Sequence, residues 1–162
     1  MLEEYDKAWA KYQEGLKIIP IPLVSWNQFP YAAAEKVAFN AIQKNWTERE
    51  NLQDILTVLK REVIITDVNF EIIFATQGVY EMNGYRPHEL MGKSPRIFQG
   101  SLTSESVKEN IKKAMNQMMP FKEIVLNYRK DGATYQCEIE AFPKFSKKGT
   151  FLNYIAFERI AS

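Results

Sequence analysis

Several residue types on which common active sites depend are scarce in this 162-residue chain. The one cysteine, Cys137, excludes an intrachain disulfide and a metal cluster of the Cys-x-x-Cys kind. The one histidine, His88, excludes most zinc sites and histidine-based catalytic triads. The sequence also lacks a glycine-rich phosphate loop, paired catalytic carboxylates and a nucleophile with a neighbouring base. We therefore predict no catalytic residue and no metal site, and we expect that the protein is not an enzyme.

The sequence also lacks an excess of charge of one sign, and it lacks long apolar runs. Lys and Arg number 21 against 20 Asp and Glu, a net charge of +1, so nothing predicts binding to nucleic acid or to an anionic membrane. No apolar run approaches the ~20 residues that span a bilayer. The N-terminal sequence MLEEYDKAWAKY is acidic and amphipathic, unlike a signal peptide. We expect a cytoplasmic protein without nucleic-acid or membrane partners.

Residues 1–54 are predicted to form a helical extension with a proline-rich extended arm. Apolar residues at alternating steps of three and four form one stripe of a first helix: Leu2, Tyr5, Trp9, Tyr12 and Leu16. The stripe could dock on its own domain or pair with a second subunit. Residues 18–30 contain three prolines and are expected to be mostly extended, because proline is poorly tolerated inside a helix. This arm is too apolar for a solvated linker and should lie across a surface.

Two further helices are expected before the main domain. The alanine-rich stretch 31–45 has one face with the residues Ala34, Val37, Ala38, Ala41 and Ile42. Thr47 and Glu50 match a capping box, which would start a third helix. The residues expected to face inward from that helix are Leu52, Ile55, Leu56 and Leu59.

Residues 55–162 have the pattern of an α+β domain. Alternating or apolar runs predict strands at 63–66, 71–75, 121–129, 134–142 and 151–160. Gly132 and Gly149 are expected in the turns that join the last three strands, where glycine supplies a positive φ. Helices are expected at 77–83 and 103–117.

The least generic part of the chain is GYRPHELMGKSPRIFQG, residues 84–100. Gly84 lies where a helix C-cap needs a left-handed residue, and Pro87 suits the first turn of a short helix that Gly92 can close. Pro95 forces Ser94 away from helical angles. The pattern predicts compact irregular backbone, which either forms the wall of a cavity or merely connects elements.

This stretch resembles the PAS family, in which a GY-like helix end is followed by a short helix containing EL, by G-K-x-P-R and by a long helix. Together with IITDVNFEIIFATQGVYEMNGY before it and NYRKDGATYQCEIEAFP after it, the resemblance covers residues 55–160. It is closest to the light-oxygen-voltage (LOV) branch, whose signature around the photoactive cysteine reads approximately G-R-N-C-R-F-L-Q-G. Here residues 92–100 read GKSPRIFQG, with Pro95 at the cysteine position. The resemblance implies the PAS fold, a five-stranded antiparallel sheet with helices on one face.

The resemblance also implies where a flavin would bind. LOV domains hold the flavin ring with two asparagines ten residues apart and with a glutamine on the last strand. Asn127 matches the first asparagine, whereas Cys137 stands at the second and Glu158 at the glutamine. Two more cavity candidates match residues that follow the photoactive cysteine: Arg96 and Gln99. The polar clamp is thus incomplete.

The cofactor stays unidentified from sequence. Proline offers no nucleophile, so adduct chemistry at Pro95 is excluded, and the incomplete clamp disfavours a flavin held without a covalent bond. Haem is not expected, because haem-binding PAS domains use a histidine on the long helix and this one has none. Strand alternation predicts that Cys137 faces inward with Tyr135 and Ile139 as a small buried residue.

Our main expectation is a sensory or signalling module that acts by small-ligand occupancy or by protein–protein contact. We expect a homodimer through the N-terminal helix and the sheet face, with an unidentified signalling protein as partner. Because no output domain follows the last strand, the signal would leave through the N-terminal helices or through that partner. A non-covalent flavin-binding redox or light sensor is the alternative. A third is an interaction domain whose cavity is filled by its own side chains: Phe74, Ile97, Phe98, Tyr135 and Phe157.

Overall fold

The computed structural model describes residues 23–162, with side chains from residue 32 onward. The stripe predicted at residues 2–16 and the first part of the proline-rich arm lie outside the described residues. The chain divides into two units, residues 1–33 and 34–162, and the second contains the complete sheet.

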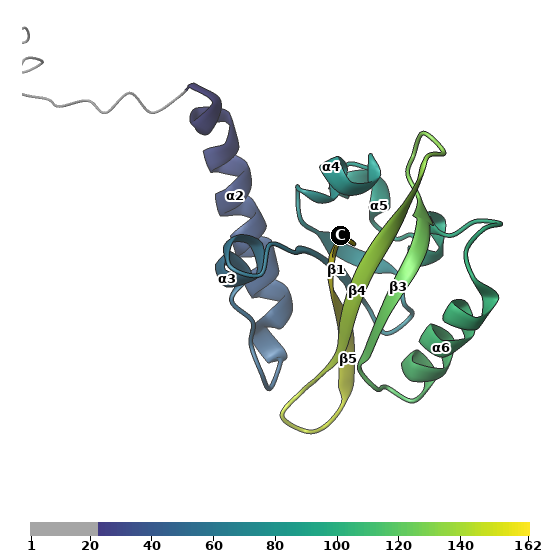
Figure 1. The fold of residues 1–162 in the computed structure, drawn as a ribbon. Coiled ribbons are helices and arrows are strands. Elements are labelled where there is room, and N and C mark those ends of the chain that lie inside the picture. The colour runs from purple at the N-terminus through teal and green to yellow at the C-terminus, as the bar shows by residue number, and fades with distance from the viewer. Residues whose placement is uncertain (1–22) are drawn as a thin grey trace, which may run out of the picture. The chain divides into compact units, whose positions relative to one another are not determined.

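Twelve elements are formed by the described residues (Figure 1). The helical elements are α2 (Leu23–Ile42), η1 (Gln43–Asn45), α3 (Leu52–Thr57), α4 (Val79–Asn83), α5 (Pro87–Leu90), η2 (Pro95–Phe98) and α6 (Glu105–Asn116). The strands are β1 (Glu62–Thr66), β2 (Ile72–Ala75), β3 (Phe121–Tyr128), β4 (Thr134–Phe145) and β5 (Phe151–Ile160). They form one antiparallel sheet in the order β2-β1-β5-β4-β3. The predicted five-stranded fold is confirmed.

The inner face of the sheet, which α4, α5 and η2 cover, holds one of two apolar clusters. Its buried members are Ile64, Ile72, Ala75, Val79, Met82, Leu90, Phe98, Tyr135 and Cys137. Residues 84–100 are fastened to the sheet edge by two backbone hydrogen bonds, from Ile72 N to Lys93 O and from Gly92 N to Ile72 O. Gly84 ends α4 with a φ of 79°, and Pro87 opens α5, as predicted. The irregular stretch therefore forms a wall over the inner face.

The outer face of the sheet packs against residues that precede β1. The buried members of this second cluster are Phe39, Trp46, Leu52, Ile55, Val63, Ile65, Phe74, Ile155 and Phe157. The Phe39 and Phe74 rings lie 5.6 Å apart between centroids, and Trp46 Nε1 donates to Asn153 Oδ1 at 2.8 Å. Phe74 and Phe157 thus belong to this cluster, and the prediction that they fill an inner cavity is wrong. Figure 1 shows α3 and α6 on opposite sides of the sheet.

The helix before the sheet differs from its prediction in two respects. It begins at Leu23 and includes Pro30, so residues 23–30 are helical rather than extended. The helix has no glycine, and the alanine-rich stretch that follows Pro30 has high helix propensity. Most of the predicted apolar face is wrong as well: Val37 is 69% exposed, whereas Phe39 and Gln43 are buried. Ile42 of that face does pack against the buried cluster, as predicted. Burial of the Phe39 ring alone removes a large apolar area from water.

The predicted capping box at Thr47 and Glu50 is also wrong. Asn51 caps α3, because its Oδ1 accepts hydrogen bonds from Gln53 N at 3.0 Å and from Asp54 N at 3.4 Å. Thr47 Oγ1 instead donates to Phe145 O at 3.0 Å, and the Glu50 carboxylate accepts from Lys144 Nζ at 2.5 Å. The side chains of Thr47 and Glu50 therefore both bind to β4 and do not cap α3.

Candidate functional site

The inner face contains a buried carboxylate beside the thiol of the chain. Glu158 on β5 is 4% exposed, and Cys137 on β4 is fully buried. Cys137 Sγ donates to Glu158 Oε2 at 3.7 Å. Cys137 faces inward with Tyr135 and Ile139, as the strand alternation predicted.

Burial changes the acidity of both groups. It raises the pKa of Glu158 to about 7, although the hydrogen bond from Cys137 favours the charged form. It also raises the pKa of the Cys137 thiol far above its ordinary value, and the neighbouring Glu158 raises it further. Near neutral pH the Glu158 carboxyl group therefore exists in both forms, and its protonated form can donate a hydrogen bond as an amide does. The thiol stays protonated and is a poor nucleophile.

Asn127 and Tyr135 extend this site along β4 and onto the neighbouring strand β3. Asn127 on β3 is 2% exposed and lies directly opposite Tyr135 in the β3–β4 register. The Arg129 guanidinium covers the Tyr135 ring at 4.9 Å from its centroid and donates to the carbonyls of Glu81 and Met82. Arg129 thereby ties the end of β3 to α4 above the inner face. We call the four residues Asn127, Tyr135, Cys137 and Glu158 the inner-face site.

Three buried polar atoms within the described residues have no hydrogen-bond partner: Thr66 Oγ1, Asn83 Nδ2 and Tyr135 Oη. Thr66 lies two positions after the inner-face residue Ile64, and Asn83 ends the helix that covers this face. A buried polar group left unpaired costs about 1–3 kcal/mol. The inner face therefore has unused hydrogen-bonding capacity that a polar molecule could satisfy.

The other two predicted cavity residues lie differently. Arg96 is exposed on η2, and Gln99 follows that turn half-buried. Neither side chain forms a hydrogen bond within residues 32–162. Pro95, at the position of the LOV cysteine, occupies the first position of η2. The structure thus brings Asn127, Cys137 and Glu158 together on three neighbouring strands, and it leaves Arg96 at the surface.

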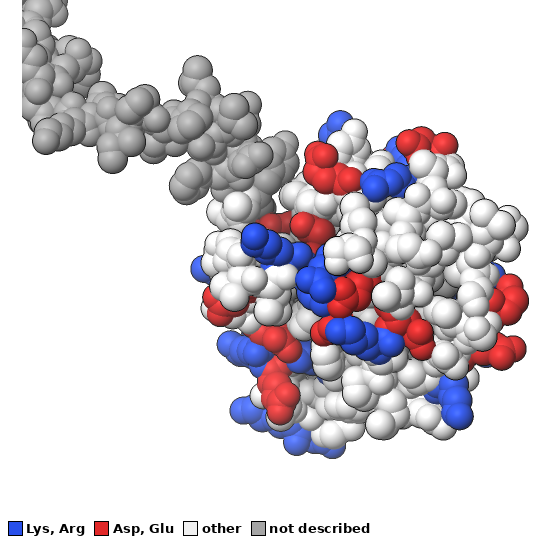
Figure 2. Space-filling model, viewed as in Figure 1, with Lys and Arg blue, Asp and Glu red and all other residues white. Residues whose placement is uncertain are grey.

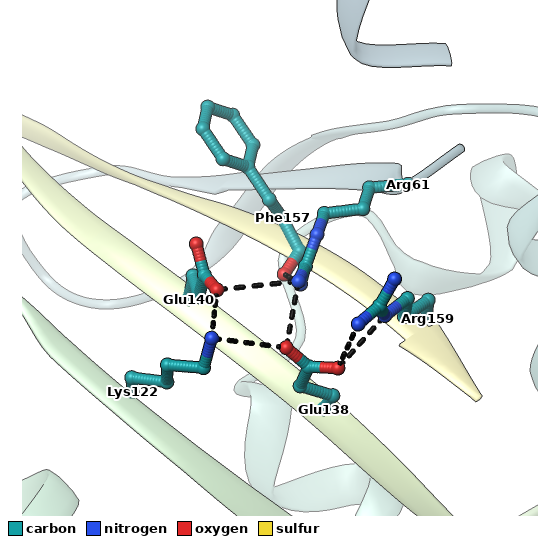
Figure 3. Close-up of polar contacts among 6 residues, drawn as sticks. All are labelled: Arg61, Lys122, Glu138, Glu140, Phe157 and Arg159. Carbon is teal, nitrogen blue, oxygen red and sulfur yellow. Dashed lines mark hydrogen bonds and ion pairs between the residues drawn. The ribbon is translucent and has the colours of Figure 1, made fainter. Parts of the chain in front are cut away.

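Sequence reasoning missed an ion-pair network on the outer face of the same strands (Figure 3). We call the five charged residues Arg61, Lys122, Glu138, Glu140 and Arg159 the outer network. The Glu138 carboxylate lies 2.7 Å from Arg61 Nη2, 2.6 Å from Arg159 Nη2 and 3.2 Å from Lys122 Nζ. Hydrogen bonds from Arg61 and then Arg159 lower the pKa of Glu138 to about 2. The outer network could be predicted from sequence only if the register of β3, β4 and β5 were already known.

Two hollows on the described surface lie away from the inner-face site. One, of about 340 Å³, is lined by Pro120, Phe121, Lys122, Glu140 and Phe142, and a second, of about 500 Å³, lies beside Trp46 and the 147–148 turn. Charges of both signs are interspersed over the face in Figure 2. Among the described residues no cluster of His, Cys, Asp and Glu suits a metal ion. None of the described helices has the length and apolarity to cross a membrane. The cytoplasmic location stays a prediction.

A family model for the PAS domain matches residues 61–159. The chain belongs to the PAS domain family. Phototropin-2 of Oryza sativa subsp. japonica is 30% identical over 112 residues, which are 67% of this chain and 12% of that protein. A nitrogen fixation regulatory protein of Klebsiella oxytoca is 26% identical over 97 residues, which are 60% of this chain and 20% of that protein. The chain thus spans a small part of these relatives.

Solved structures agree with this assignment. A LOV domain studied with a flavin analogue is 26% identical, with a TM-score of 0.63 over 68% of this chain and 84% of that one. The light-state LOV domain of the photoreceptor Aureochrome1 is 25% identical, with a TM-score of 0.61 over 69% of this chain and 90% of that one. The predicted resemblance to the LOV branch is confirmed, and the chain is a sensory and signalling PAS module.

Proposed function

We propose that this PAS domain senses a small polar molecule that binds at the inner-face site. The carrying observation is the Glu158 carboxyl group, which is buried without a cationic partner among the described residues. Its one hydrogen-bond partner there is the weak donor Cys137. Tyr135 Oη and Asn83 Nδ2 are unpaired on the same side of the sheet. A ligand with a donor and an acceptor would satisfy these groups and recover part of the cost of burying them.

Binding of a ligand at the inner-face site produces a signal only if the ligand's affinity differs between two conformations of the domain. A ligand shifts the domain between two conformations only to the extent that it binds one of them better. The inner-face site lies on the three strands whose opposite face carries the outer network. A ligand bound at the inner-face site would therefore favour one conformation of these three strands over another.

A flavin held without a covalent bond is the second candidate, and the similarity to a LOV domain studied with a flavin analogue favours it. Asn127 and the protonated form of Glu158 fit the polar edge of a flavin ring, because both can donate a hydrogen bond there. Such a group would supply visible absorption and reversible redox chemistry. Pro95 offers no thiol, so this chain would hold the flavin by hydrogen bonds and packing. Arg96 is exposed, which weakens its predicted contact with a flavin phosphate.

We infer that the domain acts by binding and not by catalysis. The Cys137 thiol has a raised pKa, and both the thiol and the Glu158 carboxyl group that accepts its hydrogen bond are closed off from bulk water. Neither group is placed as an accessible nucleophile or general base.

The predicted homodimer and signalling partner also remain proposals. The outer face is open over β3, where Ile124 is 55% exposed beside the hollow lined by Phe121 and Phe142. We propose that a second copy or a signalling protein contacts this part of the sheet together with the N-terminal helix. Light scattering on a chain lacking residues 2–16 tests the proposal. Loss of the dimer supports it, and an unchanged dimer removes that segment from the interface.

Thermal unfolding with added compounds tests ligand binding. We would measure the midpoint for the wild type, for Asn127→Ala and for a surface control, Asn110→Ala, with flavin mononucleotide and with a set of small nitrogen heterocycles. A ligand at 100 times its Kd adds about 2.7 kcal/mol of stability, or roughly 5–10 °C in Tm for a domain of this size. We expect a compound that stabilises the wild type and the control but not Asn127→Ala. If every stabilising compound acts equally on all three proteins, the inner-face site is not the binding site.

A further inference from the structure

The larger of the two surface hollows lies beside Trp46, at the turn that joins β4 and β5 (Figure 1). Its volume is about 500 Å³, within the range of about 300–1,000 Å³ that is usual for ligand pockets. The residues that line it are Lys44, Asn45, Trp46, Ser146, Lys147, Lys148, Thr150 and Leu152. We call it the basic hollow. It is separate from the inner-face site, because no residue of that site lines it.

Backbone contacts hold the two walls of the basic hollow together, although the walls are far apart in the sequence. Trp46 forms an isolated antiparallel bridge with Ser146, and Thr47 N donates to Phe145 O at 2.9 Å. Within the turn, Ser146 N donates to Thr150 O at 2.8 Å, and Ser146 Oγ accepts from Thr150 N at 3.2 Å. The fold therefore positions both walls before a ligand binds, which lowers the entropy cost of binding.

The charged side chains that line the basic hollow are all positive. Lys44 comes from η1, and Lys147 and Lys148 come from the turn. Among the described residues, no acidic side chain lines the hollow, and none of the three lysines forms an ion pair. The Arg49 guanidinium donates to the Lys44 carbonyl at 3.2 Å and adds a fourth positive charge. In a chain with a net charge of +1, this local excess of positive charge attracts anions.

The hydrogen-bonding groups of the basic hollow suit a phosphate group. Lysine ammonium groups are common phosphate ligands, and each has three donors. The Ser146 and Thr150 hydroxyls and the Asn45 amide also line the hollow, and neither hydroxyl donates to another described residue. A phosphorylated group carries a charge of about −1.5 to −2 at pH 7 and three acceptor oxygens. It can therefore use more of these donors than a carboxylate, which has two oxygens and one charge.

We propose that the basic hollow binds a phosphate monoester. The phosphate lies between Lys44 on one wall and the two lysines of the turn on the other, and the half-buried Leu152 contacts the organic part. The ester belongs either to a small molecule or to a phosphorylated side chain of a partner protein. Both present the same chemistry to the hollow, and the experiment distinguishes them. The proposal gives the domain a second binding site that does not depend on a ligand at the inner face.

The test follows the backbone amides of the isotope-labelled full chain by NMR at pH 7.5. Phenyl phosphate and a short peptide with one phosphoserine are added in separate titrations. Acetate and the unphosphorylated peptide serve as comparisons. We expect saturable shifts at residues 44–46 and 146–150 with both phosphate esters. Acetate should bind at least about tenfold more weakly than phenyl phosphate, a difference of about 1.4 kcal/mol.

Two double variants separate the hollow from the general charge of the protein. Lys147→Gln with Lys148→Gln should raise the Kd for phenyl phosphate at least about tenfold. The matched control, Lys112→Gln with Lys113→Gln, removes the same charge from an exposed part of α6 and should change the Kd by less than about twofold. Should the first double variant fail to fold, Lys44→Gln on the opposite wall replaces it and should raise the Kd at least about threefold.

Three results would overturn the proposal: no saturable shift at the hollow, equal weakening by both double variants, or acetate bound as tightly as phenyl phosphate. The second of these would mean an adventitious ion only. Two results support the proposal and identify the source of the phosphate. A phosphopeptide that binds at least about tenfold more tightly than phenyl phosphate indicates a phosphorylated partner protein, whereas a phosphopeptide that binds no more tightly indicates a small phosphate ester. Neither the probes nor the variants involve Asn127 or Glu158, so this test can fail while ligand binding at the inner face stands.

Discussion

Replacing Glu158 by glutamine should make the domain more stable, and by more at high pH. The ordinary pKa of a glutamate is 4.5, and burial raises that of Glu158 to about 7. When the folded state raises the pKa of an acid, ionisation of that acid lowers the free energy of unfolding. This destabilisation is absent at a pH below the unfolded-state pKa, where the acid is protonated in both states. The penalty grows as the pH rises from 4.5 to 7 and is complete above 7. For Glu158 the complete penalty is about 3 kcal/mol, at about 1.4 kcal/mol per pKa unit.

The assay is urea denaturation followed by circular dichroism at pH 4.5, 6, 7 and 8, for the wild type, Glu158→Gln and the exposed control Glu71→Gln. The difference in unfolding free energy between Glu158→Gln and the wild type should be near zero at pH 4.5 and should reach about 3 kcal/mol at pH 8. The control should follow the wild type throughout. A difference that does not change with pH would refute the buried, cation-free environment that we assign to Glu158.

Three other predictions follow from single residues. Phe39→Ala should cost about 3–5 kcal/mol in urea denaturation, because the ring is fully buried between α2 and the sheet; a cost below about 1 kcal/mol would contradict that packing. Cys137 should resist a thiol reagent at pH 8 in the native protein and react on unfolding, since burial raises its pKa; rapid native labelling would show an accessible thiol. Gly100→Ala should cost about 1–3 kcal/mol, because its Cβ would overlap the Tyr128 ring, and a neutral result would mean that the ring moves freely.

The sheet could be predicted from sequence because its signals are local. The strands alternate or are short apolar runs, and their ends carry turn residues. Gly132 and Gly149 have φ angles of 88° and 78°, the left-handed conformation that the turns required. The resemblance to LOV domains then supplied the strand order, which no local pattern contains.

The parts that sequence reasoning missed depend on contacts between distant residues. The spacing of apolar residues predicted that the alanine-rich face of α2 is buried, whereas the face with Phe39 packs against the sheet. Thr47 and Glu50 have the spacing of a cap, yet Phe145 and Lys144 bind them nearly 100 residues further along the chain. Asn127, Cys137 and Glu158 were found through the resemblance and alternation. The outer network and the unpaired Tyr135 hydroxyl could not be found, because both depend on register and packing.

Native mass spectrometry of the freshly purified full chain tests most directly whether the inner face binds a ligand. The account predicts that the wild type carries a non-covalently bound small molecule, that Asn110→Ala carries it too, and that Asn127→Ala has lost it. A wild-type protein with the mass of the bare polypeptide, or an Asn127→Ala variant that keeps the molecule, would contradict the account.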